Sequence, residues 1–184
     1  MGNRGPWNAE KLWHPQHPGQ PAWHIPPIIN IADGPSGLTY YPGVGLPSRY
    51  DHHFFLADFR GGAGNSGIRS FSVKPKGAGF ELVDSHEFLW NILATDVDFG
   101  PDCALYVSDW VHGWGLTGKG RIWKLQYPTN AKDSLVAETR RLLSEGMHNK
   151  GTKSLGTLLE HRDMRVRLEA QFALAQRGKD GVSE

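Results

Sequence analysis

Two segments of the chain repeat one pattern: residues 54–73 read FFLADFRGGAGNSGIRSFSV, and residues 105–125 read LYVSDWVHGWGLTGKGRIWKL. Each passes from an apolar segment through an aspartate and an aromatic residue into a glycine-rich polar loop, and then into a second apolar segment. Asp58-Phe59 aligns with Asp109-Trp110, and Gly67-Ile68-Arg69 aligns with Gly120-Arg121-Ile122. A degenerate repeat of about 50 residues made of short strands is typical of β-propeller blades. Because two blades cannot close a ring, we expect the chain to be part of a larger propeller.

Further strands are predicted around these two segments. Residues 37–41, 80–83 and 96–99 are short runs of strand-forming residues bounded by glycine and proline, and a short strand is also expected at residues 28–31. The turn Gly100-Pro101-Asp102-Cys103 leads into a strand at residues 104–108. Together the pattern predicts a mainly β region at residues 36–130, a partial β-propeller of two to three four-stranded blades.

From about residue 136 the apolar residues recur with a helical period. Helices are predicted at residues 136–145, 154–161 and 165–177. The last one carries one apolar stripe through Val166 and Ala170 and a second through Leu168 and Phe172, and a helix that is apolar on two sides packs between neighbours, as in an α-solenoid. We therefore predict three regions: an irregular segment rich in proline and tryptophan at 1–35, the propeller blades at 36–130 and a helical repeat at 136–180.

Composition narrows the classes of function. The chain has 20 lysine and arginine residues against 19 aspartate and glutamate residues, a net charge of +1, and no basic tract, so nucleic-acid binding is not expected. The single cysteine excludes an internal disulfide, and no CxxCH motif for haem attachment is present. No apolar run approaches the ~20 residues of a membrane span, and the first residues lack the basic and apolar parts of a signal peptide.

Three segments resemble a known family. DVDFGPD at residues 96–102 and ALYVSDW at 104–110 resemble the propeller of glucose/sorbosone-dehydrogenase-like proteins, in particular a group of membrane-bound dehydrogenases of planctomycete and verrucomicrobial type. LGTLLEHRDMRVRLEAQFALAQRG at residues 155–178 resembles a HEAT repeat of the phycobilisome-lyase type. The resemblance implies the C-terminal propeller blades of such a protein followed by its first HEAT repeat. Cys103 stands where the family's turn usually has glycine, which implies backbone strain if φ is positive there.

The resemblance also implies a function: oxidation of a sugar or polyol with pyrroloquinoline quinone (PQQ), in an exported or periplasmic protein that passes electrons to a cytochrome c domain or protein. Such oxidation uses a base, a Ca²⁺ ion that polarises the cofactor, and an arginine that stabilises charge. The two repeated loops are where these groups are expected. Arg60 and His112 are the candidate catalytic residues, and the candidate cofactor-binding residues are Asp58, Asn65, Asp109 and Lys119.

Each candidate also has a structural interpretation. An aspartate at the end of a blade strand often caps a turn, and His112 suits a solvent-exposed loop. In the related glucose dehydrogenases the catalytic base lies in an early blade, so this chain alone is expected to be inactive, and whether it belongs to an enzyme stays open. The alternative function is a non-enzymatic scaffold of propeller and HEAT repeat that binds a protein or a polysaccharide, because solenoids offer concave binding surfaces.

Two other groups of side chains are candidates for a metal site or a docking face. His14 and His17 flank prolines without a cysteine or acidic partner at ligand spacing, so no metal site is predicted there. Arg162, Arg165 and Arg167 form either a docking face or the solvated edge of a solenoid, and the solvated edge is the favoured interpretation.

Overall fold

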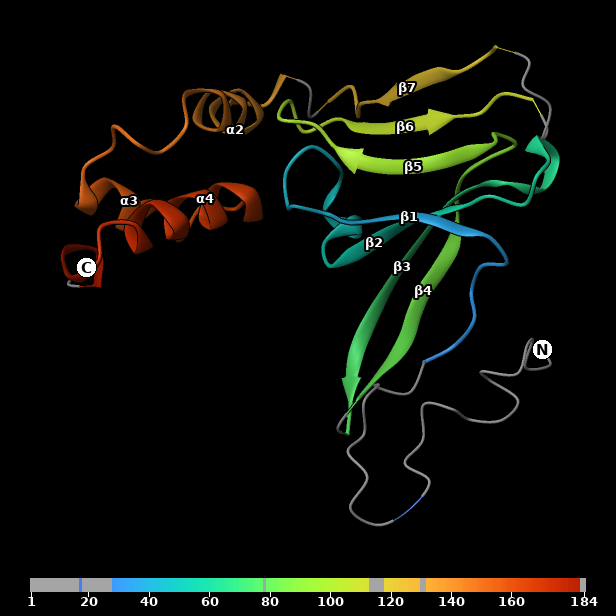
Figure 1. The fold of residues 1–184 in the computed structure, drawn as a ribbon, viewed down its shortest axis with the longest axis horizontal. Coiled ribbons are helices and arrows are strands. Elements are labelled where there is room, and N and C mark those ends of the chain that lie inside the picture. The colour runs from blue at the N-terminus through green and yellow to red at the C-terminus, as the bar shows by residue number, and fades with distance from the viewer. Residues whose placement is uncertain (1–16, 18–27, 78, 113–117, 130–131, 183–184) are drawn as a thin grey trace.

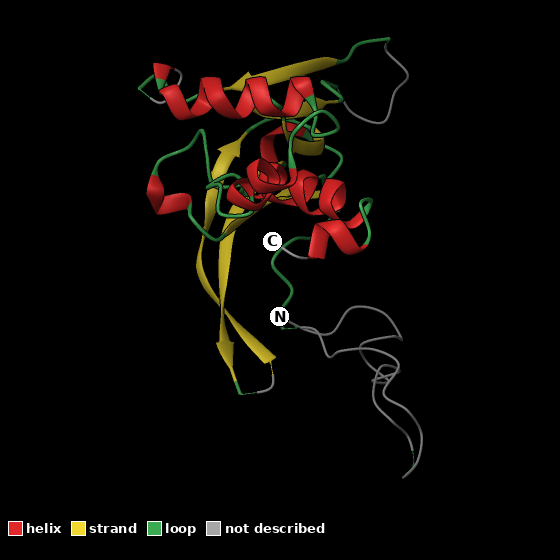
Figure 2. Cartoon of the chain, turned by 90° about the vertical axis from the view of Figure 1, so that its left-hand side faces the viewer, coloured by secondary structure: helices red, strands yellow, loops and turns green. Residues whose placement is uncertain are grey.

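Two antiparallel sheets and a group of helices make up the described part of the chain, which in this computed structural model comprises residues 17, 28–77, 79–112, 118–129 and 132–182. The helices lie to one side of the sheets (Figure 1), and the view turned by 90° shows them in front of the strands (Figure 2). Most of the irregular segment predicted at 1–35, including His14, lies outside the described residues.

Sheet A is a four-stranded meander in the order β1-β2-β3-β4. Its strands are β1 (Pro35–Tyr40), β2 (His53–Asp58), β3 (Gly67–Lys76) and β4 (Gly79–Trp90), with short 3-10 turns η1 (Ser48–Tyr50) and η2 (Ala63–Asn65) in its loops. Sheet B is a three-stranded meander of β5 (Ala94–Phe99), β6 (Leu105–Asp109) and β7 (Arg121–Leu125). Each sheet is therefore built from consecutive hairpins, as the turn residues between the predicted strands require.

The two sheets pack through their inner faces, and β1 lies beside β5 (Figure 1). A Cβ atom on Gly37 of β1 would lie 2.1 Å from Oδ1 of Asp96 in β5, so only glycine allows this approach. Alternate residues of each strand fill the layer between the sheets, as the period of a strand dictates. The resulting core consists of Tyr41, Leu46, Phe55, Ala57, Ile68, Ala94, Val97, Phe99, Leu105 and Val107.

The predicted mixture of sheet and helix is confirmed, and some predicted details are wrong. Residues 28–31 form no strand, and Ile28 and Ile29 are more than half exposed. The strand expected at 80–83 extends over the whole of β4, because it pairs with β3 along its length. Sheet B has three strands among the described residues instead of four. The described sheets do not close into a barrel.

The helices are α2 (Ser134–Glu145), α3 (Thr152–Leu158), α4 (Met164–Ala175) and α5 (Lys179–Val182). Asp133 and Asp163 cap α2 and α4, each carboxylate accepting a hydrogen bond from the backbone N–H two residues later. One predicted stripe of α4 is buried in a second core with Leu142, Met147 and Leu155. The other stripe is not covered by a neighbour: Leu168 is 43% exposed and Phe172 is 53% exposed.

The start of α4 fastens the helices to the sheets. The backbone N–H of Met164 donates to the oxygen of Pro42 at 2.8 Å. Nη1 of Arg165 donates to the backbone oxygens of Phe99 at 3.0 Å and of Gly100 at 2.7 Å. A small apolar cluster of Val44, Cys103 and Val136 joins both sheets to α2. Arg165 therefore does not lie on a solvated solenoid edge, because its guanidinium group binds the β5–β6 turn.

Candidate functional site

Asp58 lies at the end of β2, where the first glycine-rich loop begins, and Asp109 holds the matching position at the end of β6. We call these two positions the corners. The side chain of Asp58 is fully buried. Oδ1 accepts the backbone N–H groups of Asp33 and Gly34, and Oδ2 accepts hydrogen bonds from Arg60 at 2.7 Å and from Arg69 at 3.0 Å. Burial raises the pKa of Asp58, but the hydrogen bonds from Arg60, the Gly34 backbone and Arg69 outweigh it and hold the pKa below its usual value.

Asp109 accepts a similar set of hydrogen bonds at the end of β6. Its Oδ1 accepts the backbone N–H groups of Leu93 and Val111, and its Oδ2 accepts hydrogen bonds from Trp123 at 2.9 Å and Arg121 at 3.1 Å. Burial raises the pKa of Asp109, and these hydrogen bonds, led by that from Trp123, lower it below the usual value. Both aspartates therefore tie three consecutive strands of a sheet together.

The strand register corrects the alignment of the repeats by one residue. Asp58 pairs with Gly67 across β2 and β3, whereas Asp109 pairs with Arg121 across β6 and β7. The structural counterpart of Arg69 is therefore Trp123, and both donate to Oδ2 of their aspartate. The two corners therefore share their geometry, although the donor is the guanidinium group of Arg69 in one and the indole N–H of Trp123 in the other.

The remaining candidates from the sequence are arranged differently. Arg60 is bound to Asp58 and also forms an ion pair with Asp33 at 3.2 Å. Asn65 is exposed in η2, and His112 and Lys119 are exposed on either side of residues 113–117, which lie outside the described part. Among the described residues no hydrogen bond or ion pair joins His112 or Lys119 to the first loop. Of these candidates, Asp58 and Arg60 are joined directly by a hydrogen bond and an ion pair in the described part of the chain.

These corners do not have the chemistry of a Ca²⁺ site. Calcium takes six to eight oxygen ligands, with carboxylates free to face the ion. Here Oδ2 of Asp58 faces two guanidinium groups, and Oδ2 of Asp109 faces an arginine and an indole N–H. Within the described ranges, no group of three or more histidine, cysteine, aspartate or glutamate residues is arranged to hold a metal ion.

A buried serine and a buried histidine also meet an exposed aspartate in sheet A. Nδ1 of His53 lies 2.8 Å from Oγ of Ser70, and its Nε2 lies 3.2 Å from Oδ2 of Asp84. Burial lowers the pKa of His53, and the nearby Asp84 opposes this shift only in part. Ser70 is completely buried, so a substrate cannot reach its hydroxyl group. These contacts provide polar partners for the buried ring nitrogens of His53 and do not activate a nucleophile.

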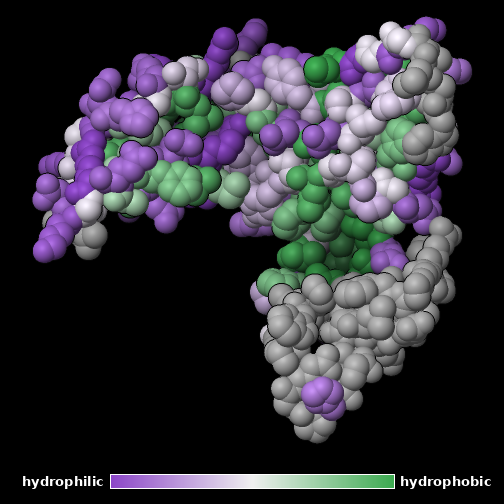
Figure 3. Space-filling view, in the orientation of Figure 1, coloured by the Kyte–Doolittle hydropathy of each residue, from purple (hydrophilic) through white to green (hydrophobic). Residues whose placement is uncertain are grey.

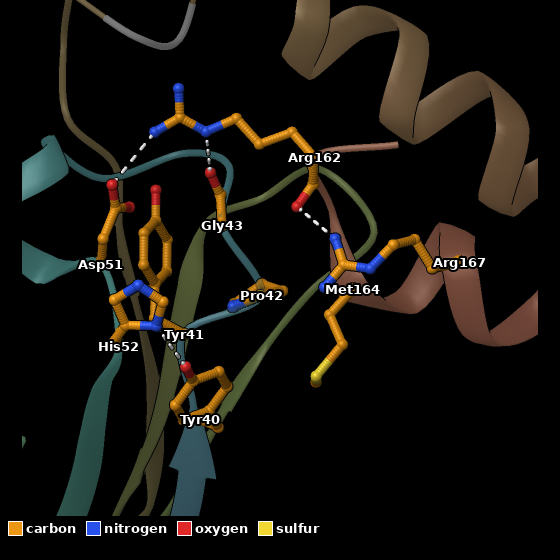
Figure 4. Close-up of a pocket in the computed structure, with 9 residues that line it drawn as sticks. All are labelled: Tyr40, Tyr41, Pro42, Gly43, Asp51, His52, Arg162, Met164 and Arg167. Carbon is orange, nitrogen blue, oxygen red and sulfur yellow. Dashed lines mark hydrogen bonds and ion pairs between the residues drawn. The ribbon is translucent and has the colours of Figure 1, made fainter. Parts of the chain in front are cut away.

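The sequence gives no indication of the cleft at the junction of sheet A and α4 (Figure 4). This cleft has a volume of about 420 Å³ and is lined by Tyr40, Tyr41, Pro42, Gly43, Asp51, His52, Arg162, Met164 and Arg167. We call it the junction cleft. Its two walls lie more than a hundred positions apart along the chain, and Nε of Arg162 joins them by donating to the oxygen of Gly43 at 2.9 Å.

Polar groups face the junction cleft from both walls. The hydroxyl of Tyr40 lies 3.0 Å from Nδ1 of His52, and Asp51 accepts a hydrogen bond from Arg162 at 3.4 Å. His52 has a positive φ of 66°, a conformation that favours glycine. Gly43 has a φ of 110°, and a Cβ atom there would lie 2.6 Å from the oxygen of Arg162. The contact between the two walls therefore requires glycine at position 43.

Comparison with protein-family models, with curated proteins and with solved structures finds no match to this chain. In the part of the chain that the structure describes, the helices are too short or too polar to cross a membrane.

Proposed function

We propose that this chain is a non-catalytic part of a β-propeller protein, in which sheets A and B are neighbouring blades and α2–α5 begin an α-solenoid fixed to them. The observation that carries the proposal is a pair of exposed apolar surfaces, one on sheet A and one on α4.

The first surface is the outer face of sheet A, which we call the aromatic face. Tyr40 and Phe54 meet edge to face with centroids 4.9 Å apart, and Phe54 stacks on Phe71 at 5.3 Å. Leu38, on the same face, is 58% exposed. Figure 3 shows hydrophobic surface gathered over these strands. A contiguous apolar surface on a sheet marks a packing partner, and another blade would pack there as sheet B packs on the inner face.

The second surface is the uncovered stripe of α4. Leu168 and Phe172 lie one turn apart on this helix, and both are exposed. In Figure 3 a smaller hydrophobic patch lies over α4. Repeats of a solenoid bury such a stripe against the next repeat. This surface supports the proposal of a HEAT-like unit that continues into further helices.

The scaffold role has better support than catalysis by this chain. The charges of Asp58, Arg60 and Asp109 are engaged in closing the two corners, and His112 and Lys119 are exposed. The sugar or polyol dehydrogenase activity that the resemblance implies, with its electron transfer to a cytochrome c, would then belong to other parts of a longer protein.

Self-association tests the two surfaces. The isolated chain is expected to form dimers or larger species in size-exclusion chromatography with light scattering, because the aromatic face and the α4 stripe are uncovered. Leu38→Lys and Phe172→Lys, each placing a charge on one surface, should shift the chain toward monomer. Thr157→Lys adds the same charge at an exposed polar position and should leave the distribution unchanged. A wild-type chain that is monomeric and melts cooperatively would overturn the proposal.

Reconstitution tests the absence of catalysis. The chain is mixed with PQQ and Ca²⁺, and reduction of an electron-accepting dye is followed with a panel of aldoses and polyols. We expect no sugar-dependent reduction above the rate of cofactor alone. Sugar-dependent reduction that disappears in His112→Gln would show that the chain is catalytic.

A further inference from the structure

We propose that the junction cleft binds a sugar acid, with its carboxylate toward Arg162 and Arg167 and its hydroxyl groups toward Tyr40, His52 and Asp51. The cleft is formed entirely by described residues, so the inference does not depend on the propeller proposal. Its volume of about 420 Å³ lies in the lower part of the range of small-molecule sites, about 300–1,000 Å³.

The helical wall provides positive charge and unused donors. Nη1 of Arg167 donates to the backbone oxygens of His161 at 2.6 Å and Arg162 at 2.8 Å, and the described residues offer its Nε and Nη2 no acceptor. Arg162 uses Nε for Gly43 and Nη2 for Asp51. Figure 4 shows the guanidinium group of Arg167 extending from α4 toward the cleft. Planar guanidinium groups with free N–H donors bind carboxylates in defined geometry.

The balance of charge favours an anion. Two arginines line the cleft against one acidic side chain, Asp51, which already accepts a hydrogen bond from Arg162. Neither arginine is deeply buried, and half of the Arg162 side chain is exposed, so both can adjust to a ligand without losing the backbone contacts that hold them.

The sheet wall provides groups suited to hydroxyls. The hydroxyl of Tyr40 and Nδ1 of His52 form one hydrogen bond, which leaves Nε2 of His52 without a partner among the described residues. The positive φ of His52 places its ring on the cleft side of the turn, as Figure 4 shows. Neutral donors and acceptors facing a pair of guanidinium groups match a ligand that carries hydroxyls and one carboxylate. This combination selects a sugar acid over a neutral sugar or a simple inorganic anion.

Isothermal titration of the full chain tests the proposal, with D-glucuronate as the probe, D-glucose as the neutral control and sulfate as the control for charge alone. Glucuronate should bind, and glucose and sulfate should bind at least about tenfold more weakly, since each lacks one of the two kinds of contact. Arg167→Gln should weaken glucuronate binding about tenfold. Arg140→Gln removes an exposed arginine from α2, outside the cleft, and should leave the affinity unchanged.

Urea unfolding shows whether Arg167→Gln still folds, and Arg162→Gln serves as the second variant if it does not. Lack of glucuronate binding by the wild-type chain would overturn the proposal. So would equal binding of sulfate and glucuronate, or glucuronate binding that neither arginine variant weakens.

Discussion

The ring of Phe59 lies at 75° to the ring of Trp110, with 6.4 Å between their centroids. These residues follow Asp58 and Asp109 in two different sheets, so their contact places the repeated corners side by side. Both corners share a design: a buried carboxylate accepts a backbone N–H group from just before the first strand of its sheet and a side-chain donor from the third strand. The corners differ in how much positive charge they bury, and this difference can be measured.

Asp58→Asn should destabilise the chain more than Asp109→Asn. Replacing Asp58 leaves Arg60 and Arg69, whose side chains are 25% and 17% exposed, without their counter-charge, which should cost about 3 kcal/mol of unfolding free energy. Arg121 beside Asp109 is 50% exposed, so that substitution should cost about 1–2 kcal/mol. Urea unfolding measures both values.

Glu145→Gln is the control for these substitutions. It breaks the pairs with Arg141 and Lys150 and should leave the unfolding free energy almost unchanged, because Glu145 is exposed. Equal, small costs for Asp58→Asn and Glu145→Gln would show that the buried corner does not hold the sheet together.

Such corners can be recognised in part from the sequence. The repeated aspartate, aromatic residue and glycine-rich loop predicted two equivalent hairpins, and the period of the strands placed most of them correctly. The loops differ in length, however, so aligning Gly67 with Gly120 missed the register in which Gly67 matches Arg121. The apolar pattern did not predict the full length of β4, because Asp84, His86 and Glu87 interrupt it. An edge strand tolerates such polar and charged residues.

His53 should make stability depend on pH below its unfolded pKa of about 6.5. Its pKa is lowered by burial, so below the unfolded value of about 6.5 the unfolded chain binds a proton that the folded chain does not. Stability is therefore full above about pH 6.5 and falls as the pH decreases toward the folded pKa. In His53→Gln this slope should flatten, as measured by urea unfolding at several pH values.

The exposed His148 provides the comparison, and His148→Gln should retain the wild-type slope. An unchanged slope in His53→Gln would mean that this histidine is not the source of the pH dependence.

Arg165→Lys should loosen the helices from the sheets. Lysine keeps the charge but cannot reach Phe99, Gly100 and Asp163 at once as the planar guanidinium group does. Hydrogen exchange should show α4 opening about tenfold more often, with β2 and β6 unchanged. Arg141→Lys, on an exposed face of α2, should leave exchange in α4 as it is. Equal acceleration in all elements would instead indicate a global loss of stability.

The thiol of Cys103 should be nearly inert in the folded chain. Burial raises its pKa to about 11, although Arg165 lowers it in part. At pH 8 a thiol-specific reagent should therefore label the native chain much more slowly than the urea-unfolded chain, because the thiolate is the reactive form. Arg165→Lys should accelerate labelling if α4 covers the thiol. Immediate labelling of the wild-type chain would contradict the burial of this turn.

Cys103 also shows what the sequence can establish about strain. Its place in a turn that usually has glycine predicted strain only if φ were positive, and φ is 59°. The junction cleft could not be predicted in this way, because Gly43 and Arg162 are 119 positions apart. The cleft depends on how the start of α4 meets the turn after β1, a tertiary contact that no local pattern encodes.

The attachment of α4 determines how the chain responds to mechanical force. Hydrogen bonds between helices and sheets gather at residues 162–165, whereas each sheet is held by ladders along whole strands. A load applied through the helical end would act on that short attachment first and break its bonds one after another. The helices should therefore detach as a folded unit before any strand separates.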